Sequence, residues 1–201
     1  MKKKILIGII VVVALALCVY AGICIKRKIE VKNENNEIKG NSKVLVVYFS
    51  AQGHTDNVAK LIAKNLNADI FKLEPVEEYT SDDLNYYDSN SRVTKEHNDE
   101  SLRNVELKST NVENFDSYDT ILIGYPIWWG IAAWPVNSFV TSNDFTGKTV
   151  IPFCTSASSG LGESSKKLAS LTTTGNWLDG HRFSSSASET EIKEWTDKIL
   201  K

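Results

Sequence analysis

Residues 43–55 constrain the fold of this chain more than any other stretch. They begin with an apolar run, Val44–Phe49, whose length and β-branched content are typical of a buried strand. The run ends in a short turn, and apolar residues then recur at helical spacing, at Val58, Leu61, Ile62 and Leu66. A strand that leads directly into a helix directs the free N–H groups and the positive dipole end of that helix at one point. We therefore expect an anion pocket, with hydroxyl donors from Ser50 and Thr55 and close backbone approach at Gly53.

The turn after this strand lacks the motifs of two common phosphate-binding loops. It contains no Gly-Lys-Ser/Thr, which argues against a nucleoside triphosphate bound with magnesium. It also lacks the Gly-x-Gly-x-x-Gly fingerprint of dinucleotide-binding folds. No Lys or Arg lies within it and Asp56 follows it, so dipoles and hydroxyls would have to hold the anion. These features favour a monophosphate carried by a larger ligand.

The sequence of residues 1–28 predicts a membrane anchor. Ile5 to Ile25 is an unbroken uncharged run with three basic residues on each side. At about 1.5 Å rise per residue, this run can cross a hydrocarbon core of about 30 Å. A cleaved signal peptide and a lipoprotein signal at Cys18 are the alternatives. No Ala-x-Ala site closes the run, and the bulky Leu17 precedes Cys18, so an uncleaved anchor is favoured.

The anchor would make this a single-pass protein of the cell membrane. Basic residues are balanced across the span, but a very short basic N-terminus normally stays in the cytoplasm, so we expect the domain on the extracytoplasmic side. Residues 29–42 are polar and rich in Asn, which predicts a flexible linker. Residues 43–201 have the length of one globular domain.

The charge and the cysteines of the chain exclude several classes of function. Six of the 23 Lys and Arg flank the anchor, which leaves 17 against 25 Asp and Glu, or about −8, for residues 29–201. This acidic balance argues against nucleic acid as a partner. Cys154 is the one cysteine of that segment, so no disulfide is expected within it. One cysteine and three scattered histidines do not make a metal site, and we expect Cys154 to be a buried structural thiol.

Strand and helix patterns alternate through the rest of the domain. Further strands are predicted at residues 69–73, 120–125, 149–154 and 180–184, and helices at 132–140, 161–171 and 188–200. Pro135 fits only the first turn of its helix, and Ser188 with Glu191 forms a capping box. Five strands that alternate with helices predict an α/β fold in three layers, a doubly wound parallel sheet covered on both faces. Ligands of such sheets bind beyond the carboxyl ends of the strands, beside the first one.

A long polar insertion separates the second and third predicted strands. It runs from Glu77 to Tyr118, and Arg92 and Glu96 within it could pair on one helical turn. One interpretation is a solvated crossover helix with extra loop. The other is a flap over the ligand, because long structured loops in compact domains are often functional.

Two further strand ends have unusual composition. The loop after the third strand contains Pro126, two adjacent tryptophans, Trp128 and Trp129, and Gly130. Trp128 could be a core residue, whereas Trp129 is better placed to stack on a planar ligand. The loop after the fourth strand is made of small residues that let main-chain groups contact the polar edge of a heterocycle: Thr155, Ser156, Ala157, Ser158, Ser159 and Gly160. A phosphate cup, an aromatic plate and a hydrogen-bonding rim match the three parts of flavin mononucleotide (FMN).

Taken together, these segments resemble the flavodoxin-like family, in its long, insertion-bearing bacterial branch. The phosphate loop, residues 123–130, and residues 149–155 with 159–162 carry the resemblance. It implies the strand order 2-1-3-4-5, bound FMN and transfer of one or two electrons. Matching positions are the phosphate loop (Ser50, Gln52, Gly53, His54 and Thr55), the stacking residue Trp129, Gly130 beside flavin N5, and the pyrimidine-edge loop from Thr155 to Gly160.

The chain departs from the family at three places. Gln52 stands where many flavodoxins have a hydroxyl residue, and His54 often has Asn in its place, so His54 either donates to the phosphate or points to water. The pyrimidine-edge loop contains no aromatic residue, which leaves one flavin face more open.

Three functions remain open. An FMN electron-transfer protein is favoured, working with a redox partner protein or a small electron acceptor. The alternatives are an FMN-dependent NAD(P)H reductase of quinones or nitroaromatics, and a flavodoxin-shaped interaction module without flavin.

Overall fold

The structure is a computed structural model that describes residues 42–199. The predicted anchor at 1–28 lies outside the described residues, as does nearly all of the predicted linker at 29–42. Within residues 42–199, no helix combines the length and the apolar character that crossing a bilayer requires.

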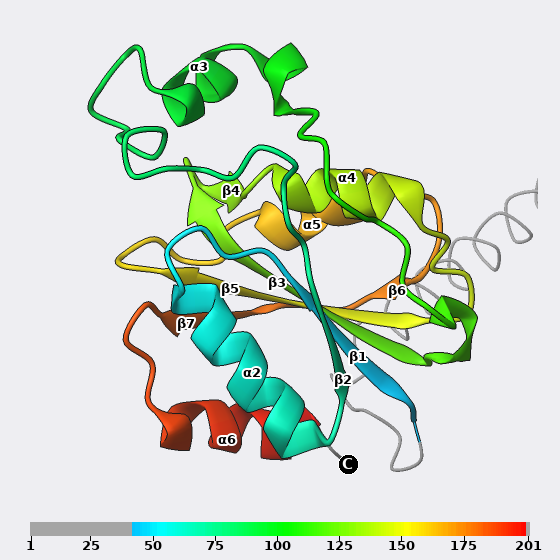
Figure 1. The fold of residues 1–201 in the computed structure, drawn as a ribbon. Helices are drawn as coiled ribbons and strands as arrows, with labels where there is room; N and C mark the ends of the chain where they lie inside the picture. The colour runs from blue at the N-terminus through cyan, green and yellow to red at the C-terminus, as the bar shows by residue number, and fades with distance from the viewer. Residues whose placement is uncertain (1–41, 200–201) are drawn as a thin grey trace, which may run out of the picture. The chain divides into compact units, whose positions relative to one another are not determined.

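A largely parallel sheet forms the centre of the domain (Figure 1). Its parallel strands are β1 (Val44–Tyr48), β2 (Asp69–Lys72), β3 (Thr120–Trp128), β5 (Thr149–Ser156), β6 (Asn176–Trp177) and β7 (His181–Ser184). The short β4 (Ile131–Ala132) pairs antiparallel with the end of β3. The strand order is β2-β1-β3-β5-β6, with β7 also paired to β5. The apolar strands β1, β3 and β5 lie in the middle of the sheet, where side chains packed against both faces bury them.

The sheet has seven strands in the described part of the chain, so the prediction of five was wrong. Two features account for the difference. The strand predicted at 120–125 continues to Trp128 and turns back on itself to form β4. The fifth position of the sheet is divided between β6 and β7, both of which pair with β5. With β5 counted as the fourth strand and β6 and β7 together as the fifth, the predicted order 2-1-3-4-5 holds.

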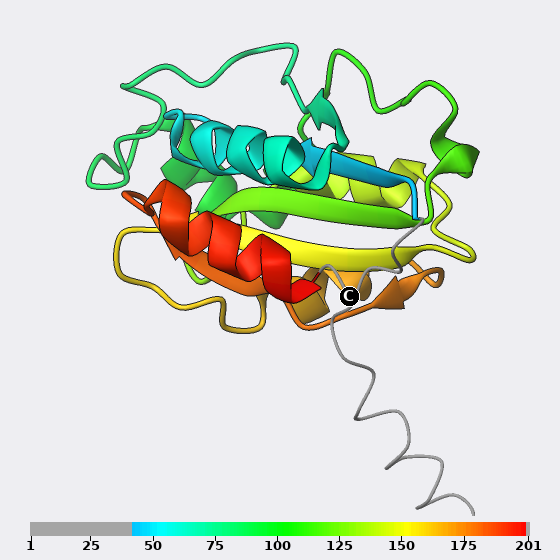
Figure 2. The ribbon, with the colours of Figure 1, turned by 90° about the horizontal axis from the view of Figure 1, so that it is seen from below.

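Helices cover both faces of the sheet, as Figures 1 and 2 show. The helices α2 (His54–Leu66) and α6 (Glu189–Ile199) lie together on one face and bury Val58, Ile62, Ile192 and Trp195 against it. The helices α4 (Pro135–Ser142) and α5 (Ser164–Ala169) lie on the other face and bury Val136, Phe139 and Leu168. The domain therefore has the predicted three layers.

The helix ends follow the predicted signals in part. Pro135 is the first residue of α4, where its missing N–H costs nothing. Ser188 Oγ accepts a hydrogen bond from Glu191 N at 3.2 Å, which confirms one half of the capping box. The helix predicted at 161–171 is reduced to 164–169, because Leu161 O instead closes a turn with Ser164.

The insertion between β2 and β3 is structured. It contains α3 (Arg92–Asn98) and two 3₁₀ helices, η1 (Glu100–Arg103) and η2 (Phe115–Ser117). Ser91 caps α3 through a hydrogen bond from Thr94 N to its hydroxyl. The predicted pair of Arg92 and Glu96 is present at 2.8 Å. In Figure 1, α3 lies above β4, beside the end of the sheet at which β3 finishes.

Candidate functional site

A cavity of about 290 Å³ lies where the loops after β1, β3 and β5 meet. Its position beyond the carboxyl ends of three parallel strands is the usual one for ligands of an open α/β sheet. Nine of the predicted site residues line it: Ser50, Gln52, His54, Thr55, Pro126, Trp128, Trp129, Thr155 and Ser156. The three loops singled out in the sequence therefore come together in space.

Five predicted site residues are not among those that line the cavity. Two of them shape the adjacent backbone, since Gly53 precedes α2 and Gly130 follows Trp129, both with positive φ. The other three, Ser158, Ser159 and Gly160, are exposed in the loop beyond Ser156. Their backbone is linked to the cavity through Ser156, whose hydroxyl donates to Ser159 O.

The N-terminus of α2 opens on the loop after β1. Gly53 is the cap residue, in a left-handed conformation with φ 87°, and no side chain caps the helix. The first helical hydrogen bond joins Asn57 N to Gly53 O at 3.0 Å. The N–H groups of the residues before Asn57 therefore take no part in the hydrogen bonds within the helix. Ser50 Oγ accepts from Gly53 N at 3.1 Å and thereby holds the loop in a tight turn. This arrangement offers main-chain donors and a positive dipole end to an anion.

A buried hydroxyl pair joins two of the loops. Thr55 and Thr155 are each about 2% exposed or less, and their Oγ1 atoms lie 2.7 Å apart. The bond connects the first turn of α2 with the end of β5, one hundred residues further along the chain. Both hydroxyls keep hydrogen-bonding capacity toward the cavity, because each oxygen can donate once and accept twice.

The negative charge of Asp56, next to this loop, is paired within α2 and β1. Its carboxylate accepts from Tyr48 Oη at 2.5 Å and from Lys60 Nζ at 2.7 Å. Burial opposes its ionisation, but the hydrogen bonds from Lys60 and Tyr48 outweigh that effect and hold the pKa of Asp56 below its usual 3.8. Burial, together with the hydrogen bond to Asp56, raises the pKa of Tyr48, so the phenol stays a donor.

Trp129 and Gly130 form the two-residue turn of the β3–β4 hairpin. The pair Trp128–Ile131 closes the turn, and both turn residues have positive φ, 46° at Trp129 and 78° at Gly130. Positive φ at both positions is the signature of a type I′ turn, which glycine accepts and a bulky residue resists. The turn leaves the Trp129 side chain 41% exposed on the cavity wall.

Trp128 has a mainly structural environment, as one of the two sequence interpretations held. Its ring makes edge contacts with Phe49, Tyr79 and Trp134, at centroid distances of 5.6, 5.1 and 5.1 Å. One part of it still reaches the cavity. Trp128 therefore connects the cavity wall to the core below it.

Arg182 on β7 organises the loop after β5. Its guanidinium donates to Ser156 Oγ at 3.0 Å, to Ser156 O at 2.8 Å and to Ala157 O at 3.2 Å. These bonds fix the small-residue rim of the cavity and place a positive charge beside it. Cys154 lies two residues before Ser156 on β5 and is fully buried. Burial raises the pKa of its thiol to about 12, although the charge of Arg182 opposes the shift. The thiol is therefore structural, as expected.

The insertion supplies a wall of the cavity, through residues that the sequence analysis did not single out. Leu84, Tyr86 and Val93 line the cavity together with Ser185 from the segment after β7. His97 of α3 is stacked on Trp129, with ring centroids 4.3 Å apart and planes 8° from parallel. In the sequence, His97 is one of three scattered histidines, and no motif assigns it a role. Its relation to Trp129 depends on the path of the insertion, which no local pattern specifies.

Comparisons with known proteins identify a family for this chain and solved structures of similar fold. The profile of a protein family described as Flavodoxin matches residues 43–199. A crystal structure of a proposed flavoprotein from Bacteroides uniformis has 40% sequence identity and a TM-score of 0.72, over 78% of this chain and 98% of that one. A corresponding protein from Bacteroides eggerthii has 38% identity and a TM-score of 0.71, over 79% and 98% of the two chains.

A flavoprotein from Lactobacillus acidophilus NCFM, solved in complex with FMN, is similar in fold. It has 20% identity and a TM-score of 0.57, over 77% of this chain and 99% of that one. A search of curated proteins found no match.

Proposed function

Because this chain belongs to the flavodoxin family, we propose that it binds FMN in the cavity beyond β1, β3 and β5 and transfers electrons through it. One observation carries the proposal. An uncapped helix N-terminus, an exposed indole and a rim of small residues surround a single cavity of about 290 Å³. A phosphate, a flat ring system and a polar ring edge need these three environments.

The phosphate would lie at the start of α2. The main-chain N–H groups there, with the hydroxyls of Ser50 and Thr55 and the side chains of Gln52 and His54, are its donors. The turn at Gly53 lets the backbone approach closely. The pairing of Asp56 with Tyr48 and Lys60 supports the assignment, because it reduces the repulsion that the carboxylate would exert on a phosphate.

The ring system would lie against Trp129. The indole offers a flat apolar face, while Pro126 and Trp128 close the cavity beneath it. The carbonyl of Gly130, the residue after Trp129, would accept a hydrogen bond from a protonated nitrogen of the flavin ring. The loop from Thr155 through Ser156, Ser158, Ser159 and Gly160 would present main-chain groups to the polar edge of the ring, held in place by Arg182.

When bound, FMN supplies reversible one- or two-electron chemistry. The residues of this chain bind it, orient it and keep water from the face that rests on Trp129. The partner is a redox protein or a small electron acceptor, and the acidic charge of the domain argues against nucleic acid.

A second candidate is an FMN-dependent NAD(P)H reductase of quinones or nitroaromatics. The observation in its favour is the open mouth of the cavity. Trp129 and Tyr86 on its wall are 41% and 59% exposed, and the loop after β5 contributes no aromatic residue to cover the ring. A second planar molecule would have room there. Steady oxidation of NAD(P)H by the purified protein, dependent on an added quinone, would select this reaction.

The domain is tethered to the cell membrane in our proposal. The support comes from the sequence, in the 21 uncharged residues from Ile5 to Ile25 and their basic flanks. The short basic N-terminus favours a single-pass orientation with the domain on the extracytoplasmic side.

Binding of FMN and riboflavin to the wild type, Thr55→Val and Trp129→Ala tests the proposal. Thr55 is buried, so Val keeps its shape and removes the hydroxyl together with its bond to Thr155. We expect Thr55→Val to weaken FMN binding about tenfold, the order of one hydrogen bond to a charged group, and to change riboflavin binding less than threefold, because riboflavin has no phosphate. Trp129→Ala should weaken both ligands. Thr141→Ala on α4 is the control, because Thr141 is exposed and bonded only within its helix.

Three results would count against the proposal. A wild-type protein that takes up no FMN would leave the flavin-free interaction module as the function. Equal losses of FMN and riboflavin in Thr55→Val would move the phosphate away from α2. Unchanged binding of both ligands by Trp129→Ala would remove Trp129 from the site. Stepwise anaerobic reduction of the loaded protein then separates one-electron transfer from a two-electron reductase.

A further inference from the structure

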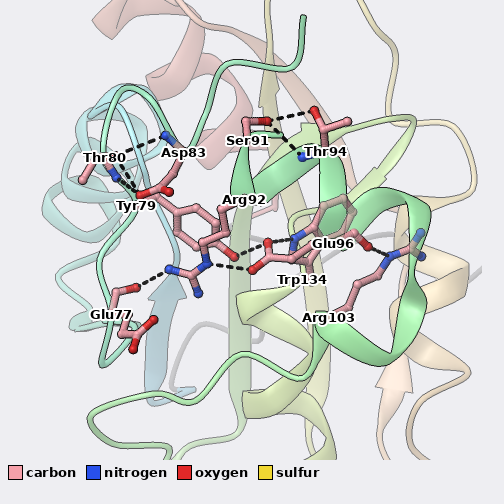
Figure 3. Close-up of polar contacts among 10 residues, drawn as sticks. All are labelled: Glu77, Tyr79, Thr80, Asp83, Ser91, Arg92, Thr94, Glu96, Arg103 and Trp134. Carbon is pink, nitrogen blue, oxygen red and sulfur yellow. Dashed lines mark hydrogen bonds and ion pairs between the residues drawn. The ribbon is translucent and has the colours of Figure 1, made fainter. Parts of the chain in front are cut away.

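A buried carboxylate helps to fix α3 of the insertion against the body of the domain. Glu96 of α3 is 5% exposed and accepts hydrogen bonds from Tyr79 Oη at 2.7 Å, Trp134 Nε1 at 2.7 Å and Arg92 Nε at 2.8 Å (Figure 3). The donors come from three different places, namely the segment after β2, the residue before α4, and α3 itself. Burial and the bond to Glu96 raise the pKa of Tyr79, which therefore remains a donor. A buried charge with three donors is costly to break, so α3 has a defined position.

The backbone that follows Glu96 is also held. Arg103 Nε donates to Glu96 O at 2.9 Å, and its Nη2 donates to His97 O at 2.5 Å. The Arg103 guanidinium lies 4.9 Å from the centre of the Trp134 ring, which anchors it over the core. The position of His97 thus follows from contacts that do not involve its own side chain.

The His97 ring covers one face of Trp129. Their centroids are 4.3 Å apart and the planes differ by 8°. Trp129 lines the cavity and His97 does not, an arrangement that favours the indole face away from the cavity as the one that His97 covers. The Trp134 ring is also nearly parallel to Trp129, with centroids 6.0 Å apart and planes 21° from parallel. Without these contacts, a tryptophan in a strained two-residue turn would have several side-chain orientations open to it.

The imidazole is held by stacking and not by hydrogen bonds at Nδ1. This atom is buried and has no hydrogen-bond partner, and within residues 42–199 it is the one side-chain nitrogen or oxygen in that condition. A buried polar atom without a partner destabilises the folded state. The contact that His97 makes with Trp129 therefore depends on its flat ring and not on a hydrogen bond from Nδ1.

We propose that His97 is a positioning residue, which supports Trp129 from behind so that the indole is parallel to the ring system it receives. The insertion would then hold the Trp129 side chain in position, in addition to forming one wall of the cavity. This inference rests on the proposed FMN function. It assigns His97 no contact with the flavin and no role at the phosphate.

The test compares His97→Ala and His97→Phe with the wild type. We expect His97→Ala to weaken FMN and riboflavin binding by the same factor, about tenfold, because it affects the ring end of the ligand alone. His97→Phe should bind both within threefold of the wild type, because phenyl keeps the stack. It should also unfold at the same temperature or higher, because it removes the unpaired nitrogen. Lys95→Ala, an exposed change on the same helix, is the matched control.

Tryptophan fluorescence of the flavin-free protein gives a second readout. His97→Ala should change the emission, because Trp129 loses the ring stacked on it. The same substitution should have little effect in a Trp129→Phe background, where the other tryptophans remain. A change of the same size in both backgrounds would show that His97 does not act on Trp129 and would overturn the inference.

The binding data separate this inference from the function on which it rests. Wild-type binding of FMN with unchanged affinity in His97→Ala would overturn the positioning role alone. His97→Phe as weak as His97→Ala would do the same, since the ring plane would then not be sufficient. A wild type that fails to bind either flavin would overturn the proposed function, and the positioning role with it.

Discussion

Trp129 occupies a backbone conformation that suits asparagine or glycine better than tryptophan. Its φ of 46° lies in the left-handed region, and Gly130 follows it at 78°. A non-glycine residue there costs about 1–2 kcal/mol, and a bulky one is a marked outlier. Strain of this kind persists where the surrounding structure enforces it, here through β3, β4 and the stack with His97.

This strain leads to a prediction for Trp129→Asn. Asn-Gly is the preferred sequence of a type I′ turn, so the substitution relieves strain while it removes the ring contacts, each worth about 1 kcal/mol. We expect the free energy of unfolding to fall by no more than about 2 kcal/mol, because the relieved strain offsets much of the lost contact energy, and FMN affinity to fall at least tenfold. Urea unfolding and flavin titration measure the two quantities.

Gly130→Ala is the matched control for that experiment, since a Cβ at φ 78° adds strain to the same turn. It should lower stability by about 1 kcal/mol. A loss of more than about 2 kcal/mol in Trp129→Asn would contradict the argument, because Trp129 would then stabilise the hairpin that it is expected to strain.

At the scale of elements, α2 carries a pH-dependent contribution to stability. Hydrogen bonds from Lys60 and Tyr48 outweigh burial and lower the pKa of Asp56 in the folded state. A carboxyl with a lowered pKa stabilises the fold above its unfolded pKa, and this contribution is lost as the pH falls through the folded pKa. Its position in the first turn of α2 adds a favourable interaction with the helix dipole.

Asp56→Asn should therefore be less stable than the wild type at pH 7 and equally stable well below pH 3.8. Partial exposure screens the charge, so we expect a difference of about 0.5–1 kcal/mol at pH 7. Denaturant unfolding at several pH values measures it. Asp197→Asn, at an exposed pair with Lys193, should show a smaller effect. A difference that persisted unchanged at pH 2.5 would mean that the charge of Asp56 is not its source.

The long elements were predictable because their own residues specify them. The runs at β1, β3 and β5 are apolar on both faces, and α2 and α6 have clear apolar stripes. The two-residue strands β4 and β6 were not predictable, because pairing with a neighbour defines them. The loops after β1, β3 and β5 were predicted correctly because the position of each loop follows from the strand before it. Tyr86, His97 and Arg182 were missed, because their place in the site depends on how distant segments pack.

The predicted membrane anchor at residues 1–28 can be tested by deletion. Removal of residues 1–28 leaves intact every strand and helix of the described domain. The Bacteroides uniformis structure matches this domain over 98% of its own length, which supports independent folding. We expect the shortened protein to remain in the supernatant after high-speed centrifugation of lysed cells, and the full chain to pellet. A shortened protein that still pellets with membranes, while binding FMN normally, would place the membrane contact in the domain.

The residues that line the cavity extend from Ser50 to Ser185, across nearly the whole described chain. No short fragment of the chain contains them all, so the cavity exists only after the sheet has assembled. FMN would then be a ligand of the native state, and it would stabilise that state by mass action. We expect the half-life of the protein in the cell to follow the supply of flavin. Cells starved of riboflavin should degrade it faster, so its abundance would report their vitamin status.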